Sequence, residues 1–455
     1  MALYRKDSGP FKPKPTPFGG FIDGEPAVTG PHLLISGPSG VGKSRRVIIP
    51  AVLMWQGPVV AISSKPDLID EALEQRLAWG GAGRTYVLDL SGSVPDDVLP
   101  EGVIRVVADP VALVIDDDSA IDMATILIQT GSAGAGDGST KADPFWDTIS
   151  TAPLAGLIRA AGPDGIAWAR AAVGRVEAPV VEVDEEPDTT SPCWVNAIGR
   201  LEEVGSDMLA EELAGAAKLS DKMRDSVLAT MKSAVAPWWR RDVVGPTGTA
   251  PFTPAMLEHP RSTLFMIAPA DGVAAGAAVG VVDTISAHWR RAQTAPEPLP
   301  HLLIAVDELC NTLPWRKLPV VVTEARAMGI AVLAAVQATK QFSRRFGHDI
   351  MEELRAVFPA VLVLCEADEK EMLERAAWSH GRGERHKVST DHAGRQSQSS
   401  ELVETLHGSD LLPQDIDHGR LLRGRRQADA NDPAVRAAGM LVELHDISDL
   451  QFDAS

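Results

Sequence analysis

The sequence predicts an α/β protein in which a mostly parallel sheet is covered by helices on both faces and carries an inserted all-helical domain. Three observations support this fold class. Continuous apolar runs of strand length alternate with helical patterns toward both ends of the chain, which is typical of parallel strands buried on both faces. A glycine-rich loop joins the first such run to a helix. In the region between, apolar residues at helical spacing replace the strand patterns.

Length and composition agree with a soluble globular protein. The chain has 455 residues, of which 45% are hydrophobic and 23% charged, enough for roughly three average domains or one large domain with an insertion. The formal net charge of −19 argues against a surface that coats duplex DNA indiscriminately, although a local basic channel stays open.

The cysteines and the N-terminus indicate a cytoplasmic protein. Cys193, Cys310 and Cys365 lie far apart without metal-ligand spacing, so we expect reduced thiols in a reducing compartment. The start of the chain is rich in Lys and Pro and lacks the apolar core of a signal peptide. No uninterrupted apolar run reaches the length of a membrane span, so no transmembrane segment is expected.

The first part of the α/β domain is predicted over residues 31–115. An irregular segment, residues 1–30, precedes it and is broken by several prolines. The helix over Lys43–Trp55 contains Pro50, which should kink it or end its first part. The other elements expected here are the strands His32–Ser36, Pro58–Ser63, Thr85–Leu90 and Val103–Val107 and the helix Leu68–Trp79.

The loop between the first strand and this helix fits the P-loop pattern G-x-x-x-x-G-K-[ST] at every defined position. Its glycines let successive backbone N–H groups point at phosphate oxygens, and the helix N-terminus adds a favourable partial charge. Lys43 would reach the β- and γ-phosphates of ATP, and the Ser44 hydroxyl would bind Mg²⁺. The predicted nucleotide-binding residues are Gly37, Pro38, Ser39, Gly40, Val41, Gly42, Lys43 and Ser44.

Residues 116–240 are predicted to form the all-helical insertion. We expect a flexible glycine-rich break at Gly131–Gly138 and a mobile acidic linker at Glu177–Asp188. The segments with helical periodicity are Ile121–Gln129, Phe145–Ala161, Trp194–Val204, Met208–Leu219 and Met223–Ala236.

The α/β pattern resumes over residues 241–455, the second part of the domain. The polar stretch His380–Ser400 is expected to be a long exposed loop. The predicted strands are Ser262–Ala268, His301–Val306, Ile330–Val336, Ala360–Leu364 and Met440–Leu444, and the helices are Ala274–Ala292, Leu318–Met328 and Glu369–Trp378.

A second motif follows the strand His301–Val306, which ends in Asp307 and Glu308. Two acids after an apolar strand form a Walker B pattern. Asp307 would hold Mg²⁺, directly or through water, and Glu308 would polarise the water that attacks the γ-phosphate. This pattern is weak alone, but a full P-loop upstream strengthens it because the two motifs must meet around one metal ion.

Two further residues are candidates with open alternatives. Gln337 follows the strand Ile330–Val336, where its amide would contact both the water and the γ-phosphate, or it simply begins a loop. Arg326 lies near the end of the preceding helix. It would reach a neighbouring subunit's site as an arginine finger, or it is a surface arginine favoured near a helix C-terminus.

The order of these motifs resembles the coupling ATPases of conjugation and type IV secretion, the TraG/TraD group within the HerA/FtsK-like P-loop NTPases. The resemblance covers roughly residues 30 to 445, and its more specific parts are the Phe-Trp-Asp sequence and the arginine-to-glutamine block. The fragments that carry it are Gly37–Ser44, Gly57–Asp67, Pro144–Asp147, Val306–Asn311, Glu324–Ile330 and Ala335–Ala338.

This resemblance implies a RecA-like motor with Lys43, Ser44, Asp307, Glu308 and Gln337 in one site and Arg326 supplied by a neighbour. It further implies a homo-oligomer, a hexameric ring with a central channel through which DNA, expected to be single-stranded, moves. Relaxosome and type IV secretion components would be its partners. Members commonly carry N-terminal membrane helices. Because no transmembrane segment is expected in this sequence, we expect either a membrane-anchoring partner or a cytoplasmic location. Arginines in 382–387 and 420–426 are candidate phosphate contacts or solvated loop charges.

Three functions are therefore compared. The first is an ATP-hydrolysing DNA translocase that delivers DNA to a conjugative type IV secretion channel. The second is an ATPase receptor that recruits secreted protein substrates through the helical insertion. The third is a nucleotide-binding adaptor without motor activity. Turnover with and without DNA, and the behaviour of Glu308→Gln, separate them.

Overall fold

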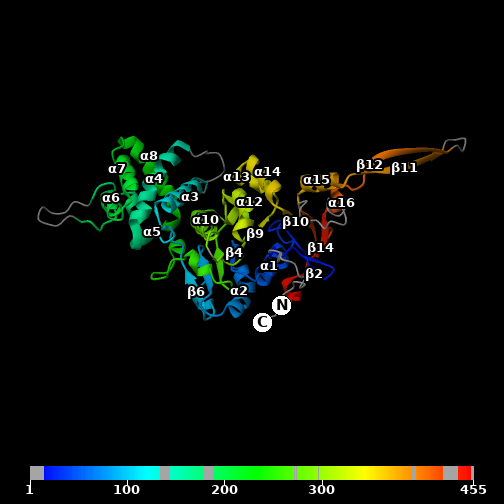
Figure 1. Ribbon diagram of the computed structural model, residues 1–455, viewed down its shortest axis with the longest axis horizontal. Coiled ribbons are helices and arrows are strands. Elements are labelled where there is room, and N and C mark those ends of the chain that lie inside the picture. Colours follow the sequence, from blue (N-terminus) through cyan, green and yellow to red (C-terminus); the bar gives the residue numbers. More distant parts are fainter. Residues whose placement is uncertain are drawn as a thin grey trace. The chain divides into compact units, whose positions relative to one another are not determined.

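The computed structural model describes residues 15–133, 144–178, 188–270, 272, 274–295, 297–390, 396–423 and 439–451. Within these ranges the side chains of residues 325, 326, 385–390, 396–399, 401 and 423 are left undescribed. The chain divides into two compact units (Figure 1). The first comprises Met1–Trp55, Leu303–Asp307 and Leu318–Ser455, and the second comprises Gln56–Leu302 and Glu308–Lys317.

The sheet of the first unit combines parallel central strands with an antiparallel flank. Strand β3 pairs in parallel with β9 on one side and with β10 on the other, and all three are fully buried. The carboxyl ends of these strands therefore meet at one edge. The strand order is β2 (Glu25–Pro26), β1 (Phe21–Ile22), β14 (Met440–Glu443), β13 (His418–Arg423), β10 (Ala360–Leu364), β3 (His32–Ser36), β9 (Ile330–Val336) and β8 (Leu302–Val306).

The helix after the P-loop changes its winding where the sequence places Pro50. Residues Lys43–Ile48 form a π-helical segment, η1, and the α-helix α1 runs over Ile49–Met54 with Pro50 in its first turn. A proline is tolerated there because first-turn N–H groups have no partner within the helix. The winding thus changes next to the predicted proline, and the helix continues to Met54 without a break.

The remaining helices of the first unit follow its strands along the chain. Of them, α13, α14, α16 and the 3₁₀ turn η6 were not predicted from the sequence, and neither were the strands β1, β2 and β13. These helices are α12 (Leu318–Met328), α13 (Lys340–Phe346), α14 (His348–Val357), α15 (Lys370–His380), α16 (Gly408–Leu411) and the 3₁₀ turn η6 (Ile447–Asp449).

The prediction of a long exposed loop over His380–Ser400 is wrong. Strands β11 (Arg382–Thr390) and β12 (Gln396–Glu404) form an antiparallel two-stranded ribbon next to α15 (Figure 1). Backbone hydrogen bonds hold such a ladder whatever the side chains are. Because polar residues occupy both faces, the sequence lacks the apolar alternation by which strands are recognised.

The second unit contains four strands in the order β4 (Val59–Ser63), β7 (Thr263–Ile267), β5 (Thr85–Asp89) and β6 (Val103–Val106), each parallel to its neighbours. Helices α2 (Asp67–Gly80) and α10 (Ala275–Ala292) connect successive parts of this unit, and the short α11 (Leu309–Thr312) follows Glu308. The predicted α/β fold, a mostly parallel sheet with covering helices, is confirmed.

Helices occupy most of the described chain between β6 and β7. Helix α4 is the centre of this group, since it packs against α3, α5, α6, α7 and α8. The domain boundaries 116 and 240 stay predictions. The helices are α3 (Asp117–Ala133), α4 (Pro144–Ala161), α5 (Gly165–Val173), α6 (Trp194–Glu203), α7 (Asp207–Ala217), α8 (Asp221–Ala234) and α9 (Arg241–Val244), of which α5 and α9 were not predicted.

The expected glycine-rich break is wrong at its start, because residues 131–133 continue helix α3. A Cβ built on Gly131 would lie 2.8 Å from the backbone oxygen of Ser233 on α8. This glycine therefore permits a close approach of two helices. The rest of the break, residues 134–138, and most of the acidic linker, residues 179–187, lie outside the described residues.

Candidate nucleotide-binding site

The P-loop leaves β3 at the edge where the parallel strands end. The Gly37 N–H donates to the carbonyl of Val336, 3.2 Å away, which extends the β3–β9 ladder by one bond. A Cβ at Gly37 would lie 2.9 Å from the Cβ of Leu364 on β10. Gly40 and Gly42 have φ angles of 88° and 86°, a left-handed conformation that favours glycine. The pattern's glycines are thus required by backbone conformation and by close packing.

Lys43 is buried within its own loop. Its Nζ donates to the carbonyl oxygens of Gly37 at 2.6 Å and Pro38 at 2.7 Å, and the residue is only 7% exposed. The ammonium therefore lies over the loop backbone, within reach of any anion that the loop N–H groups would bind.

The two motifs meet at Ser44 and Asp307. The Ser44 Oγ donates to Asp307 Oδ2 at 2.6 Å, although the residues are 263 positions apart. Asp307 directly follows β8 and is 6% exposed. A hydroxyl and a carboxylate are hard oxygen ligands of the kind that Mg²⁺ accepts, together with phosphate oxygens and water. The residues present therefore fit the expected metal ion, and the predicted contact between the motifs is confirmed.

Glu308 stands in an uncommon backbone conformation. Its φ of 53° places it in the left-handed region, which costs a non-glycine residue of order 1–3 kcal/mol and is often found at functional sites. Its carbonyl accepts the N–H groups of Asn311 and Thr312 in the first turn of α11. Its carboxylate Oε2 lies 3.5 Å from the Ser64 Oγ, at the limit of a hydrogen bond. The strained backbone fixes the direction in which this acid leaves β8.

Gln337 lies beside the P-loop, since it follows Val336, which accepts the Gly37 N–H. Its own N–H donates to the Gln341 Oε1 at 3.1 Å, and the residue is half-buried. Arg326 lies on α12, but its side chain is outside what the structure describes. The roles of Gln337 and Arg326 therefore stay predictions.

Two arginines directly after the P-loop motif bind the C-terminal part of the chain, which the sequence did not predict. Arg45 makes a bidentate contact with Asp446 at 2.7 and 3.0 Å, and this hydrogen-bonded contact holds the pKa of the Asp446 carboxyl well below its usual range. Arg46 donates to the Leu444 carbonyl at 2.7 Å and pairs with Asp417 at 2.8 Å. Partners about 400 positions away leave no local sequence signal.

Among the candidate phosphate contacts, Arg420 is structural. Its Nε donates to the carbonyl of Leu411 at 3.0 Å, and burial lowers the pKa of its guanidinium. Arg382 lies at the start of β11 and is exposed. The side chains of residues 385, 423, 425 and 426 lie outside the described part.

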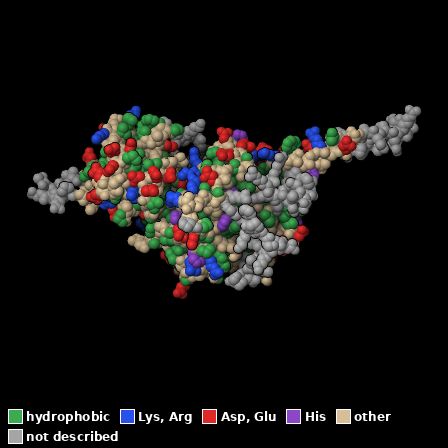
Figure 2. All heavy atoms as spheres, in the orientation of Figure 1, with side chains coloured by type: hydrophobic (Ala, Val, Ile, Leu, Met, Phe, Trp, Pro, Cys, Tyr) green, Lys and Arg blue, Asp and Glu red, His purple; other side chains and the backbone are tan. Residues whose placement is uncertain are grey.

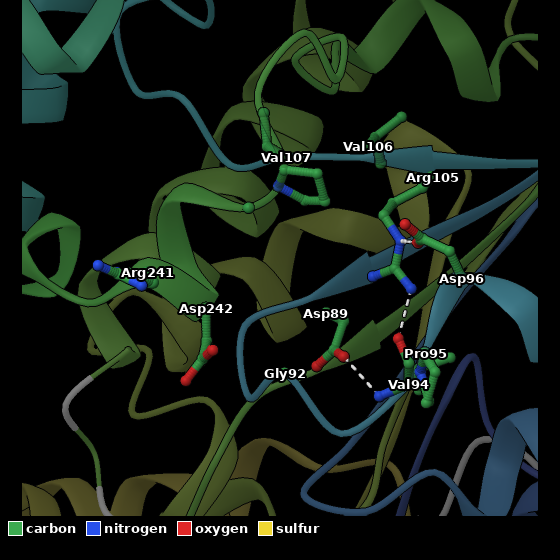
Figure 3. A pocket seen from close by; sticks show the side chains of 12 residues that line it. Asp89, Gly92, Val94, Pro95, Asp96, Arg105, Val106, Val107, Arg241 and Asp242 are labelled. Carbon is green, nitrogen blue, oxygen red and sulfur yellow. Dashed lines mark hydrogen bonds and ion pairs between the residues drawn. The ribbon is translucent and has the colours of Figure 1, made fainter.

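The second unit contains a separate cavity of about 330 Å³ at the carboxyl ends of β5 and β6 (Figure 3). Asp89 points into it, but its oxygens already accept the N–H groups of Ser91 and Val94 and the Ser91 hydroxyl. Arg105 is paired with Asp96. These polar groups satisfy one another, so the cavity is not assigned to the nucleotide site.

Fold and site together define an α/β protein that carries a P-loop at the carboxyl edge of a mostly parallel sheet. Residues 301–416 match the family model described as the TraM recognition site of TraD and TraG, which confirms the predicted resemblance to the TraG/TraD group. The match includes Asp307, Glu308 and Gln337 and covers about a quarter of the chain.

Solved structures of the bacterial conjugative coupling protein TrwB have a similar fold. The unbound TrwBdeltaN70 form has a TM-score of 0.59 at 16% identity and covers 97% of this chain and 90% of its own. The TrwB complex with the ATP analogue ADPNP also has a TM-score of 0.59 at 16% identity, with 97% and 91% covered. The complex with ADP and Mg²⁺ has a TM-score of 0.55 at 16% identity, with 93% and 92% covered. No curated protein matches the sequence.

Among the described residues, every helix is too short or too polar to span a lipid bilayer.

Proposed function

We propose that the chain binds ATP with Mg²⁺ and hydrolyses it. The observation that carries this proposal is the 2.6 Å contact between Ser44 of the P-loop and Asp307 after β8. TrwB structures with ADPNP and with ADP and Mg²⁺ support the choice of nucleotide and metal ion. Mg²⁺ would neutralise charge on the phosphates and orient them.

Each site residue then has a distinct task. Backbone N–H groups of residues 37–44 cradle the phosphates, and the Lys43 ammonium moves from the loop carbonyls to the β- and γ-phosphate oxygens. Ser44 and Asp307 hold the metal ion. Glu308 orients and polarises the attacking water, and Gln337, beside the P-loop, contacts this water and the γ-phosphate. Arg326 of a neighbouring copy supplies positive charge to the transition state.

We further propose that this ATPase is a coupling protein that moves DNA toward a conjugative type IV secretion channel. The motif order and the likeness to TrwB, described as a conjugative coupling protein, support this. The working form would be a hexameric ring with single-stranded DNA in its channel. Relaxosome and secretion components would be partners, as would a protein that holds the ring at the inner face of the membrane.

Surface charge restricts where DNA would bind. On the face drawn in Figure 2, acidic side chains are spread widely among the basic ones, in keeping with the net charge of −19. Phosphate binding therefore requires a local basic lining, as a ring interior would provide.

The decisive experiment measures ATP turnover and oligomer size with and without single-stranded DNA. We expect Mg²⁺-dependent turnover that DNA stimulates, and a nucleotide-dependent oligomer. Glu308→Gln should retain bound ATP and stop turnover, whereas the exposed control Glu202→Gln on α6 should behave as the parent. If the parent protein binds ATP but never hydrolyses it, and Glu308→Gln changes nothing, the adaptor function replaces the motor.

A protein-receptor function is the second candidate, because the matched family model is described as a recognition site for the protein TraM. This likeness supports recognition through residues 301–416, whereas the sequence suggested the helical insertion. Binding of the full chain to relaxosome proteins and to DNA, measured separately, distinguishes the two. Tight protein binding together with turnover that DNA leaves unchanged would favour the receptor.

A further inference from the structure

A buried carboxylate, Glu369, lies where the loops after β3, β9 and β10 meet. It is 1% exposed and stands at the N-cap of α15, yet its side chain makes no capping bond with that helix. An acid at this position ordinarily accepts an N–H of its own helix. Here the carboxylate instead accepts hydrogen bonds from residues outside α15.

The carboxylate of Glu369 accepts three hydrogen bonds, one from Ser36 at the end of β3 and two from Thr339 in the segment after β9. Oε1 accepts the Ser36 Oγ at 2.6 Å and the Thr339 N–H at 2.6 Å, and Oε2 accepts the Thr339 hydroxyl at 2.7 Å. Ser36 and Thr339 are completely buried. Short hydrogen bonds to a buried carboxylate oxygen are strong and directional.

Arg355 of α14 completes this cluster. Its Nε donates to the Thr339 Oγ1 at 2.7 Å, and its Nη2 lies 3.9 Å from Glu369 Oε2. The Thr339 hydroxyl thus donates to the acid while accepting from the guanidinium, which fixes its orientation. The positive charge also compensates the buried carboxylate.

The two residues that donate hydrogen bonds to Glu369 are close in sequence to proposed site residues. Ser36 directly precedes Gly37, the first residue of the P-loop, and Thr339 lies two residues after Gln337. One carboxylate therefore holds the start of the P-loop and the loop that carries Gln337 in a fixed relation. Displacing a catalytic group by about 1 Å can cost about a hundredfold in rate.

We propose that Glu369 is a positioning residue for ATP turnover that keeps Gln337 in register with the P-loop. The inference rests on the proposed ATPase function. It concerns turnover more than nucleotide binding, because the hydrogen bonds that Glu369 accepts come from Ser36 and Thr339 and not from the phosphate-binding residues 37–44.

The test is Glu369→Gln in the full chain, with kcat, KM for ATP and thermal unfolding measured together. We expect kcat to fall about ten- to hundredfold, with KM changed less than about threefold and the protein still folded. The matched control is Glu374→Gln on the same helix, whose carboxylate is 56% exposed and pairs with Lys370. It should retain the parent kcat and KM.

Thr339 provides a second pair in case Glu369→Gln fails to fold. Thr339→Ser keeps the hydroxyl and should turn over ATP like the parent. Thr339→Val removes the hydroxyl and should lower kcat with KM retained. Parent-like kcat in both Glu369→Gln and Thr339→Val would overturn the inference alone. Loss of kcat only in proportion to lost folded protein would also overturn it. A parent chain without turnover would overturn the proposed function as well.

Discussion

The substitution Gly131→Ala tests the packing of two helices, because helix propensity and the observed packing predict opposite changes in the free energy of unfolding. It lies in helix α3, and its φ is not positive, so alanine can adopt its backbone conformation. If Gly131 only weakened the helix, Gly131→Ala would stabilise the protein by about 1 kcal/mol through helix propensity and reduced freedom of the unfolded chain.

The packing against α8 reverses this expectation. A Cβ at Gly131 would lie 2.8 Å from the Ser233 oxygen, 2.9 Å from the Ser233 carbonyl carbon and 3.0 Å from the Ala234 Cα. All three are backbone atoms, so relief requires the two helices to separate by several tenths of an ångström. Overpacking of this kind costs roughly 1–3 kcal/mol, which exceeds the propensity gain over most of its range.

The assay is thermal unfolding of Gly131→Ala beside Gly199→Ala on α6, where a Cβ meets nothing within 4 Å. We expect the unfolding temperature of the second unit to fall for Gly131→Ala and to rise for Gly199→Ala. A shift of about 2–4 °C per kcal/mol is typical of domains of this size. An equal rise in both variants would refute the close approach of α3 and α8.

Two further predictions concern the P-loop and the helix that follows it. Ser44→Ala removes a hydroxyl ligand and should raise the Mg²⁺ concentration needed for half-maximal turnover about 10- to 100-fold. A titration with Mg²⁺ at saturating ATP measures this concentration. An unchanged Mg²⁺ requirement would contradict the role of Ser44. Asp446→Asn should destabilise the protein at pH 7 by about 1 kcal/mol, because Arg45 is 43% exposed and solvent screens the pair. Since the folded pKa of Asp446 is depressed, this stability is fully present above the unfolded pKa of about 3.9 and is lost progressively as pH falls from there through the folded pKa. Urea unfolding at pH 7 and pH 3 should therefore show a smaller difference between parent and variant at pH 3 than at pH 7.

Sequence alone predicted those parts of the fold that local patterns encode. The central strands are continuous apolar runs, so their residue ranges in β3, β9 and β10 were predicted to the residue. The site motifs were likewise predictable because glycine, lysine and acid spacing reflects phosphate and metal chemistry. Strand β13 was missed because Gly419 and Arg420 interrupt its apolar pattern. The ribbon of β11 and β12 was missed because both of its faces are polar.

Contacts between distant polar residues could not be predicted in this way. Glu369 stands among other acids in Cys-Glu-Ala-Asp-Glu-Lys-Glu, and nothing in that sequence marks it as the buried one. Its burial follows from the strand order, which places the loops after β3, β9 and β10 at one edge. The fold must therefore be known before this residue can be distinguished from Glu366 or Glu371.

Three such contacts lie around the P-loop, and none of them can be predicted from the P-loop pattern. Ser36 is bound to Glu369, Ser44 to Asp307 and Arg45 to Asp446, across 333, 263 and 401 positions. A chain that lost Glu369 or Asp446 would keep every residue of the P-loop pattern. It would lack the bonds that fix the beginning of the loop or the helix after it. An intact motif therefore predicts that a nucleotide binds, whereas the rate of the proposed turnover would depend also on residues that the motif does not contain.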